Sequence, residues 1–312
     1  MDKIAVLIPC YNESTTIDKV VSDFKRVLPE AVIYVYDNNS SDGTDEIAKN
    51  AGAIVRYEYR QGKGNVVRSM FRDIDAECYI MVDGDDTCPA ETAVTMAEDI
   101  FSGKADMVIG DRLSSTYFET NTRRFHSWGN NWVRKMVNRI FKSDIKDVMS
   151  GYRAFSYVFV KTFPVLSRGF QIETEMSIHA THRNLKISHV PVEVRNRPQG
   201  SESKVKTWSD GWKIEQTIRC LYRTYRPDRY YSIVTGKLLI ISGLFSIPVF
   251  KDCMYAGSIN RIAPLIIAGC ALFSAIISLF TGVILKTMAI KDQQDFEIRL
   301  NQYTDRFNKI KC

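Results

Sequence analysis

Apolar runs with the character of buried strands alternate with helix-like segments over the first 110 residues, and this alternation restricts the fold. The apolar runs occupy residues 4–9, 31–36, 54–57, 78–82 and 107–109. Helical patterning covers residues 17–24, 46–50 and 90–101, and a further helix begins near Gly64. Such alternation predicts a mostly parallel sheet with helices on both faces. Because ligands of such sheets bind where the strands end, we expect a functional site at the carboxyl edge.

Three carboxylates, those of Asp83, Asp85 and Asp86, follow the apolar run at residues 78–82. Unit charges ~4 Å apart repel by about 4 kcal/mol at an effective dielectric constant near 20, so the cluster needs a counter-charge. A divalent cation can supply it, since Mg2+ binds one or two carboxylates together with substrate phosphates. Asp83 and Asp85 occupy alternate positions and are expected to point into one crevice. A solvated acidic turn is the alternative for this cluster taken alone.

Two segments near the C-terminus, residues 238–250 and 262–285, contain no charged side chain. The second is long enough to cross a bilayer, which requires about 20 apolar residues. The first reaches that length only if it is extended back past Lys237, whose ammonium group can reach the membrane surface from near a helix end. We therefore predict transmembrane helices at residues 231–250 and 262–285. A buried helical hairpin of a soluble protein is the alternative.

Basic residues flank the two apolar segments more densely than they occupy the loop between them. The loop between the segments has only Lys251 and Arg261. The four arginines before the first segment are Arg219, Arg223, Arg226 and Arg229. The six basic residues after the second segment are Lys286, Lys291, Arg299, Arg306, Lys309 and Lys311. The positive-inside rule then places both termini and residues 1–230 in the cytoplasm. The N-terminus leads directly into a strand, so we expect no signal peptide. Seven cysteines without a C-x-x-C pair indicate free thiols of a reducing compartment.

The formal net charge of +6 is modest, and the basic residues form no run and no nucleic-acid motif. Anionic lipid head groups and a phosphorylated substrate fit this charge better than nucleic acid does. Residues 208–225 place Ile214, Ile218 and Leu221 on one helical face and basic residues elsewhere. This pattern predicts an amphipathic helix in the membrane interface, with packing against the globular domain as the alternative.

Several polar motifs stand at the predicted strand ends, at residues 9–13, 37–44, 62–64 and 83–85, followed by residues 110–112, 149–153 and 200–204. In this order, and with two C-terminal spans, they resemble the family 2 glycosyltransferases, in particular the polyprenyl-phosphate glycosyltransferases related to dolichol-phosphate mannose synthase. The resemblance implies a Rossmann-like α/β catalytic domain of the GT-A fold at 1–205, a juxtamembrane amphipathic helix at 206–230, two transmembrane helices within 231–285 and a cytoplasmic tail at 286–312.

The resemblance also assigns the donor half of a site. Nucleotide contacts fall on six residues: Pro9, Tyr11, Glu13, Asp37, Lys63 and Asp83. Asp83 and Asp85 would hold Mg2+ or Mn2+ on the donor diphosphate, which makes Asp85 catalytic. Arg197, Ser203 and Lys204 resemble a loop that closes over that diphosphate and neutralises the charge it gains as the leaving group. Asp86 lies beyond the core motif and is expected to be solvated or to act behind the ligands.

An acceptor half is implied by basic residues further along the chain. Arg112, Arg123 and Ser127 match contacts to an acceptor phosphate, with Arg123 catalytic and Arg124 replacing it if the alignment slips by one residue. A phosphate monoester has its second pKa near ~6 and is already a nucleophile at neutral pH, so no strong base is required. Asp147, also proposed as catalytic, is therefore expected to orient the acceptor or contact the metal.

The expected reaction is inverting transfer of one sugar from a nucleotide sugar to a polyprenyl phosphate on the cytoplasmic membrane face. The first candidates are UDP-glucose as the donor and undecaprenyl phosphate as the acceptor. GDP-mannose, UDP-N-acetylhexosamine and a modified arabinose donor are the alternative donors. A processive polysaccharide synthase is disfavoured because Cys220 stands where such an enzyme has tryptophan. A non-catalytic sugar-nucleotide-binding adaptor is disfavoured because Asp83 and Asp85 are both present. Glu173 and Glu175 fit sugar recognition or structural ion pairing equally. A homo-oligomer formed through the transmembrane helices also stays open.

Overall fold

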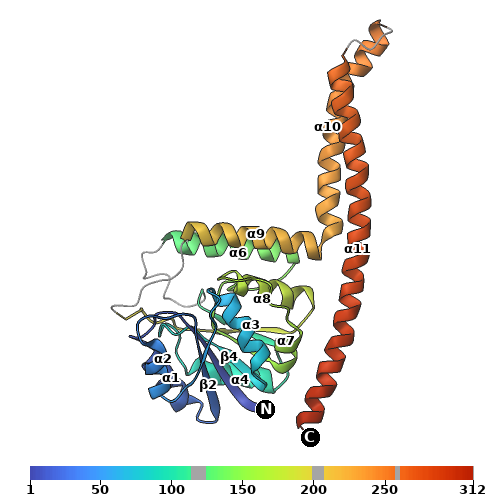
Figure 1. The fold of residues 1–312 in the computed structure, drawn as a ribbon. Coiled ribbons are helices and arrows are strands. Elements are labelled where there is room, and N and C mark those ends of the chain that lie inside the picture. Colours follow the sequence, from blue (N-terminus) through green and yellow to red (C-terminus); the bar gives the residue numbers. More distant parts are fainter. Residues whose placement is uncertain (114–123, 199–206, 257–260, 312) are drawn as a thin grey trace. The chain divides into compact units, whose positions relative to one another are not determined.

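The computed structural model describes residues 1–113, 124–198, 207–256 and 261–311 (Figure 1). The chain divides into two compact units, one formed by residues 1–218 together with 298–312, and the other by residues 219–297. The first unit contains the sheet. The second contains two long apolar helices.

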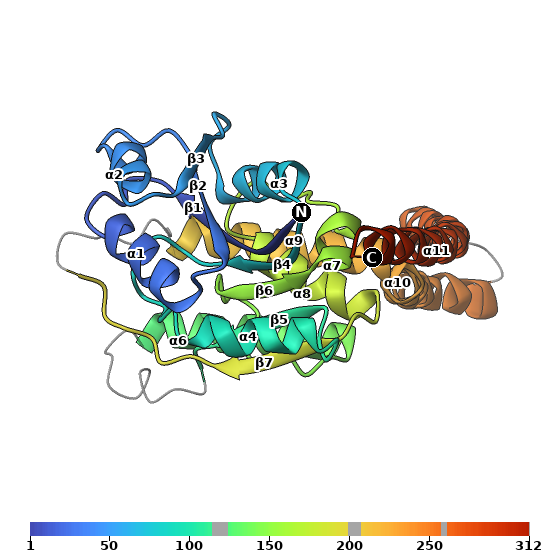
Figure 2. The ribbon, with the colours of Figure 1, turned by 90° about the horizontal axis from the view of Figure 1, so that it is seen from below.

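The first unit is built on a seven-stranded sheet in the order β3-β2-β1-β4-β6-β5-β7 (Figure 2). Its strands are β1 (Asp2–Cys10), β2 (Ala31–Asp37), β3 (Ile54–Tyr57), β4 (Ala76–Met81), β5 (Met107–Asp111), β6 (Arg153–Ser156) and β7 (Ile187–Pro191). All neighbours are parallel except β6, which is antiparallel to both β4 and β5. The predicted mostly parallel α/β fold is confirmed.

Helices cover both faces of this sheet. The helices are α1 (Ile17–Val27), α2 (Thr44–Asn50), α3 (Lys63–Asp73), α4 (Thr92–Phe101), α6 (Arg124–Phe141), α7 (Tyr157–Thr162), α8 (Ile172–His182) and α9 (Thr207–Tyr225). Of these, α6 and α9 lie beyond the carboxyl edge of the sheet rather than on a face (Figure 1). On one face, α1 and α4 pack their apolar positions on β1 and β4. On the other, the ring of Phe155 of β6 meets Phe71 of α3 edge-to-face and stacks on Phe159 of α7, with ring centroids 5.6 and 4.8 Å apart. β1 is therefore buried on both sides, as its uninterrupted apolar sequence requires.

The elements β6 and α7 were not predicted from the sequence. β6 has only four residues, and it is fixed by pairing with β4 and β5, more than 40 residues away in sequence. Local patterning carries no signal for such an insertion. Its presence matters because it brings residues 147–151 to the carboxyl edge of the sheet, next to the end of β4.

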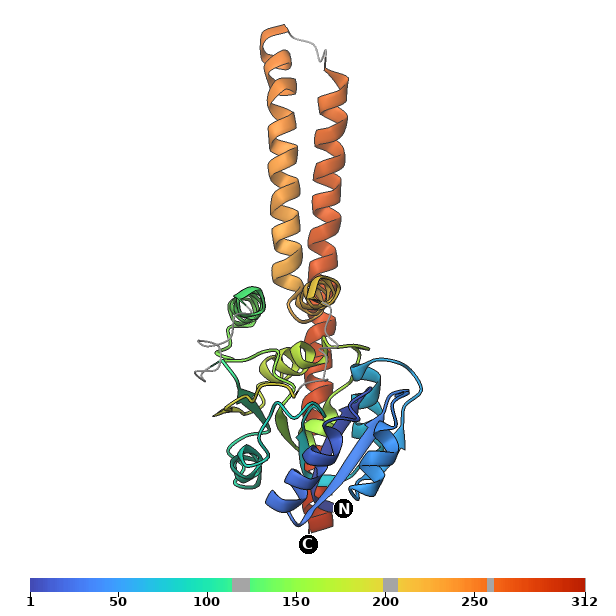
Figure 3. The same cartoon turned by 90° about the vertical axis from the view of Figure 1, so that its left-hand side faces the viewer.

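The second unit contains α10 (Pro227–Ala256) and the first part of α11 (Ile262–Lys311), which run side by side (Figures 1 and 3). Small residues let the helices approach: Ala268, Ala271 and Ala275 are buried, and the Ser242 hydroxyl donates to the Ala268 carbonyl at 2.9 Å. Segments 227–255 and 262–309 have mean hydropathies of 1.9 and 2.4 over their most apolar windows. By length and composition, both helices are apolar enough to cross a membrane.

Candidate active site

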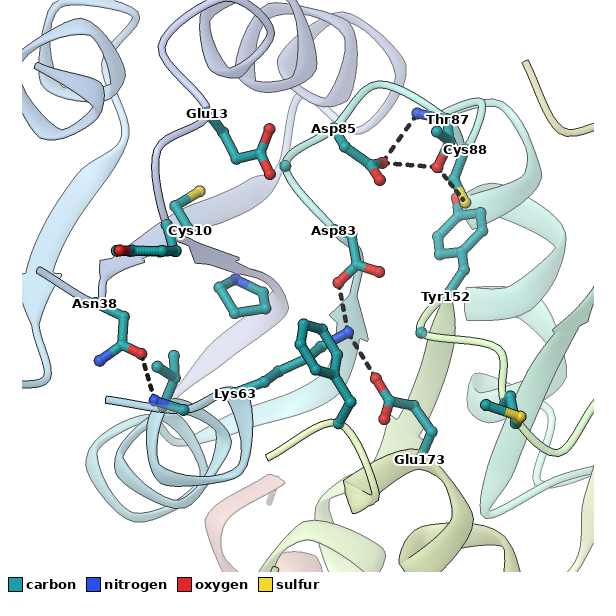
Figure 4. A pocket seen from close by; sticks show the side chains of 18 of the residues that line it. Cys10, Glu13, Asn38, Lys63, Asp83, Asp85, Thr87, Cys88, Tyr152 and Glu173 are labelled. Atoms are coloured by element: carbon teal, nitrogen blue, oxygen red, sulfur yellow. Dashed lines mark hydrogen bonds and ion pairs between the residues drawn. The ribbon is translucent and has the colours of Figure 1, made fainter. Parts of the chain in front are cut away.

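A cavity of about 480 Å³ opens at the carboxyl edge of the sheet (Figure 4). It is lined by the ends of β1 and β4, by the start of α3, and by residues that precede and follow β6 in the sequence. Eight residues predicted from the sequence to form a site line it: Pro9, Tyr11, Glu13, Lys63, Asp83, Asp85, Arg112 and Arg197. The strand ends thus bring together residues from positions 9 to 197 of the chain, as a parallel sheet does.

Lys63 joins two carboxylates at the floor of this cavity (Figure 4). Its Nζ lies 2.5 Å from Asp83 Oδ1 and 2.7 Å from Glu173 Oε1. Burial lowers the pKa of the Lys63 ammonium, but the two carboxylates outweigh this and leave the pKa above its ordinary value. Burial likewise raises the pKa of Asp83, but Lys63 holds it below its usual range. The pair is therefore fully charged, and the Asp83 side chain stays 41% exposed, open to a ligand.

Gly151 makes this ion pair sterically possible. A Cβ atom at this position would lie 2.6 Å from Asp83 Oδ2 and 2.9 Å from Lys63 Nζ. We expect Gly151→Ala to displace the Asp83 carboxylate and to weaken nucleotide binding about tenfold, or ~1.4 kcal/mol, measured by calorimetry. Gly211→Ala is the matched control, because a Cβ there meets no atom within 4 Å. Equal nucleotide affinities in the two variants would contradict this role of Gly151.

Asp85 and Asp86 have different surroundings although they are adjacent. Asp85 is 5% exposed, accepts hydrogen bonds from the Thr87 hydroxyl at 2.7 Å and its N–H at 3.2 Å, and pairs with Arg197 Nη2 at 2.5 Å. Asp86 has a left-handed backbone with φ of 53° and is bound by Lys19 through both oxygens, at 2.6 and 2.7 Å. Asp86 is therefore tied to α1, whereas Asp85 lines the cavity.

The oxygen donors in the cavity suit a hard divalent cation. Among the residues that the structure describes, no three His, Cys, Asp or Glu side chains form a cluster able to hold a metal by themselves. The Asp83 and Asp85 carboxylates alone match the way Mg2+ binds, through one or two carboxylates with substrate phosphates completing the shell. A metal here would thus depend on a phosphorylated ligand.

Arg112, on the other side of the cavity, is held by a buried carboxylate. Its Nε and Nη2 donate to Asp147 Oδ2 and Oδ1 at 2.8 and 3.2 Å. Burial lowers the pKa of Arg112, but Asp147 outweighs this and raises it above the ordinary value. The Asp147 side chain is 1% exposed and does not line the cavity, whereas that of Arg112 is 25% exposed and does. Asp147 therefore stands behind Arg112 and orients it.

The end of β2 shapes the rim of the cavity. Asn38 accepts a hydrogen bond from the Gly62 N–H at 2.7 Å and donates to the Arg60 carbonyl at 3.0 Å, which fixes the turn before α3. Asp37 Oδ2 accepts from the Ser40 N–H at 3.0 Å. Its Oδ1 is buried and has no hydrogen-bond partner among the residues of the described structure. Asp37 is 3% exposed and, unlike Asn38, does not line the cavity. A ligand hydroxyl group is one partner that would satisfy its Oδ1.

The family model described as "Glycosyl transferase family 2" matches residues 5–163. The chain belongs to this family. Glycosyltransferase AglJ of Haloferax volcanii is 36% identical over 75% of this chain and 76% of AglJ. Dolichyl-phosphate hexose transferase of the same organism is 27% identical over 70% of this chain and 92% of its own.

A solved structure of a Mycobacterium tuberculosis enzyme resembles this family 2 glycosyltransferase in fold. It is glucosyl-3-phosphoglycerate synthase in complex with Mn2+, UDP-glucose and phosphoglyceric acid. The TM-score is 0.58, with 18% sequence identity over 71% of this chain and 80% of that chain. At this identity, the likeness shows the fold alone.

Some predicted site residues of this family 2 glycosyltransferase lie outside the described structure. They are Arg123, Ser203 and Lys204, together with the side chains of Arg124 and Ser127. Their roles stay predictions. Conversely, Asn38, Phe170 and Gly151 line the cavity but were not predicted from the sequence as site residues. Asn38 and Gly151 lie within the motifs at residues 37–44 and 149–153, so the sequence did contain a signal for them. Phe170 lies in no motif, and its position follows only from the packing of the turn before α8.

Proposed function

We propose that this family 2 glycosyltransferase transfers one sugar from a nucleotide sugar to a polyprenyl phosphate, with inversion at the anomeric carbon. One observation carries the proposal: the carboxylates of Asp83 and Asp85 and the guanidinium of Arg112 line the same cavity. A metal-bound diphosphate fits the acidic side, and a second phosphate fits the basic side. Two phosphorylated substrates can thus meet there despite their mutual repulsion.

The donor is a nucleotide sugar bound with Mg2+ or Mn2+, with UDP-glucose as the first candidate. The bound metal would neutralise charge on the departing diphosphate. The buried Asp37 Oδ1 suits a ribose hydroxyl, and Asp83, fixed by Lys63, presents its remaining oxygen to the ligand. Arg197 pairs with Asp85 and is expected to move onto the diphosphate when the donor binds.

The acceptor is a lipid phosphate because the chain combines Arg112 with two helices apolar enough to span a bilayer. A phosphate dianion attacks without a base, so Arg112 need only hold it in line with the anomeric carbon. The curated relative named dolichyl-phosphate hexose transferase supports this class of acceptor. By the positive-inside rule, both termini and the sheet lie in the cytoplasm.

Exposed side chains of the first unit support its attachment to a membrane surface. Trp132 of α6 is 44% exposed and Trp212 of α9 is 61% exposed, and both helices lie on the same side of the sheet (Figures 1 and 3). Lys135 and Arg139, one and two helical turns after Trp132, are exposed as well. Tryptophan next to basic side chains is typical of helices that lie in a membrane interface.

Release of nucleoside diphosphate tests the donor assignment. The purified protein, in detergent with undecaprenyl phosphate, is offered UDP-glucose, UDP-N-acetylglucosamine and GDP-mannose in turn, with Mg2+ or Mn2+. We expect release from one donor, dependent on both metal and lipid, with UDP-glucose the leading candidate. Release that is equally fast without lipid would mean that the protein is a hydrolase. Release with the metal chelated would contradict the role of Asp83 and Asp85.

A further inference from the structure

Arg153 is a fully buried cation directly below the cavity. It is the first residue of β6, where it pairs in register with Met81 of β4 and Ile109 of β5. Its side chain is 0% exposed, and it does not line the cavity. Arginine is almost never fully buried unless it is paired, so its place in the middle of a sheet requires a reason.

The Arg153 guanidinium binds neutral acceptors. Nε donates to the Ser150 carbonyl at 2.8 Å, and Nη2 donates to the Val148 carbonyl at 2.7 Å and to the Ser177 hydroxyl at 2.9 Å. Within the described residues, it forms no ion pair. Burial lowers its pKa to about 10, and the nearby charges of Glu173 and Asp147 oppose this, so the group stays protonated at neutral pH. Burying an apolar residue of similar volume at this position would cost less free energy than burying a charged group.

The groups bound by Arg153 belong to two of the segments that contribute residues to the cavity. Val148 and Ser150 lie in the turn between Asp147, which orients Arg112, and Gly151, which abuts the Lys63–Asp83 pair. Ser177 lies in α8, one turn after Glu173, and its hydroxyl also contacts the Glu173 carbonyl at 2.9 Å. The Arg153 guanidinium therefore connects the segment behind the acceptor-side arginine with the helix that bears the Lys63 partner. The Ser177 hydroxyl, 3.3 Å from the Val148 carbonyl, also joins these two segments directly.

We propose that Arg153 is a positioning residue that holds residues 147–151 and the start of α8 so that the donor and acceptor groups face each other across one cavity. The assignment of one side of the cavity to the donor and the other to the acceptor rests on the proposed function. The contacts of Arg153 do not depend on that assignment. The rigid fork of the guanidinium suits the task, since it fixes three acceptors in set directions, which a lysine ammonium does not.

Two substitutions of Arg153 test the inference. Arg153→Met removes the fork at similar length, and Arg153→Lys keeps the charge. A displacement of about 1 Å can reduce a rate by about 100-fold. We therefore expect Arg153→Met to lower transfer by that factor, through a higher KM for the lipid phosphate, and to weaken nucleotide binding. Arg153→Lys should recover part of both. Ser177→Ala, which cuts only the link to α8, should weaken nucleotide binding more than it raises the lipid KM.

Lys161→Met is the matched control for lost stability. Lys161 also binds backbone carbonyls, those of Phe71 and Ile74 at 2.9 and 2.8 Å, and it pairs with Asp75 at 2.7 Å, but it lies away from the cavity. We expect it to lower the Tm and to leave nucleotide affinity and KM unchanged. If the Arg153 variants, like Lys161→Met, changed only the Tm, the positioning role would be refuted.

The design also separates this inference from the proposed function. Nucleotide affinity, measured by calorimetry with UDP-glucose and Mn2+, does not depend on any lipid acceptor. If the wild type bound nucleotide but transferred nothing to lipid phosphate, the proposed acceptor would be wrong, and the affinities would still decide the role of Arg153. If Arg153→Met failed to fold, Arg153→Lys and Ser177→Ala would decide it by the same measurements.

Discussion

Replacement of Asp85 by asparagine should reduce sugar transfer by about 1,000-fold, equivalent to ~4 kcal/mol in the activation barrier. Asp85 is 5% exposed and lines the cavity, and its carboxylate is held in place by Thr87. An amide of the same shape keeps the fold but removes the negative charge that a divalent cation requires. The measurement is kcat with saturating donor and lipid, together with Mn2+ affinity in the presence of UDP.

Asp86→Asn is the matched control for this prediction. Asp86 follows Asp85 directly, yet it is bound by Lys19 at 2.6 and 2.7 Å and lies 3.7 Å from Arg195. We expect its loss to lower the Tm and to leave kcat and Mn2+ affinity near the wild-type values. If Asp86→Asn lost Mn2+ affinity, or Asp85→Asn kept it, the metal would bind elsewhere.

Replacement of Arg112 by glutamine should raise the KM for lipid phosphate by about 100-fold, or ~2.7 kcal/mol, and change the KM for the donor little. The guanidinium lines the cavity, and Asp147 holds two of its nitrogens. The single variant would also leave the Asp147 carboxylate buried without its partner, which destabilises a protein by about 3–5 kcal/mol. A lower Tm must therefore be separated from a lost phosphate contact.

The double variant Arg112→Gln/Asp147→Asn makes that separation, because it removes both charges together. We expect its Tm to recover relative to Arg112→Gln, while the lipid KM stays high. Asp147→Asn alone should show an intermediate KM, since Arg112 remains but is less well oriented. A loss of kcat at unchanged KM in Asp147→Asn, with a new pH dependence, would instead identify Asp147 as a base.

Much of the fold followed from local sequence patterns. The strand β1 was predictable from its uninterrupted apolar run, and the helix α1 from apolar residues that recur at helical spacing, such as Val20 and Phe24. β6 was not, because its position depends on pairing with β4 and β5 rather than on its own four residues. The helical continuation of α11 beyond residue 285 was also missed, although Phe296, Leu300, Tyr303 and Phe307 recur there at helical spacing and are less exposed than their neighbours.

The candidate site was predictable where motifs stand at strand ends, as Asp83 and Asp85 do. The partners of these motifs were not, because ion pairs such as Lys63 with Glu173 join residues more than 100 positions apart. Asp147 illustrates the difference. The sequence shows a carboxylate near other functional residues, and only the structure shows that it faces Arg112 from behind.

The mass of the lipid product tests the central claim most directly. Undecaprenyl phosphate is incubated with the purified protein, the donor and the metal, and the extracted lipid is weighed by mass spectrometry. We predict one new species, heavier than the acceptor by a single anhydrohexose unit, or by the corresponding residue for another sugar. Unmodified lipid alongside free sugar and nucleoside diphosphate, or a ladder of several sugars, would contradict single transfer to a lipid phosphate.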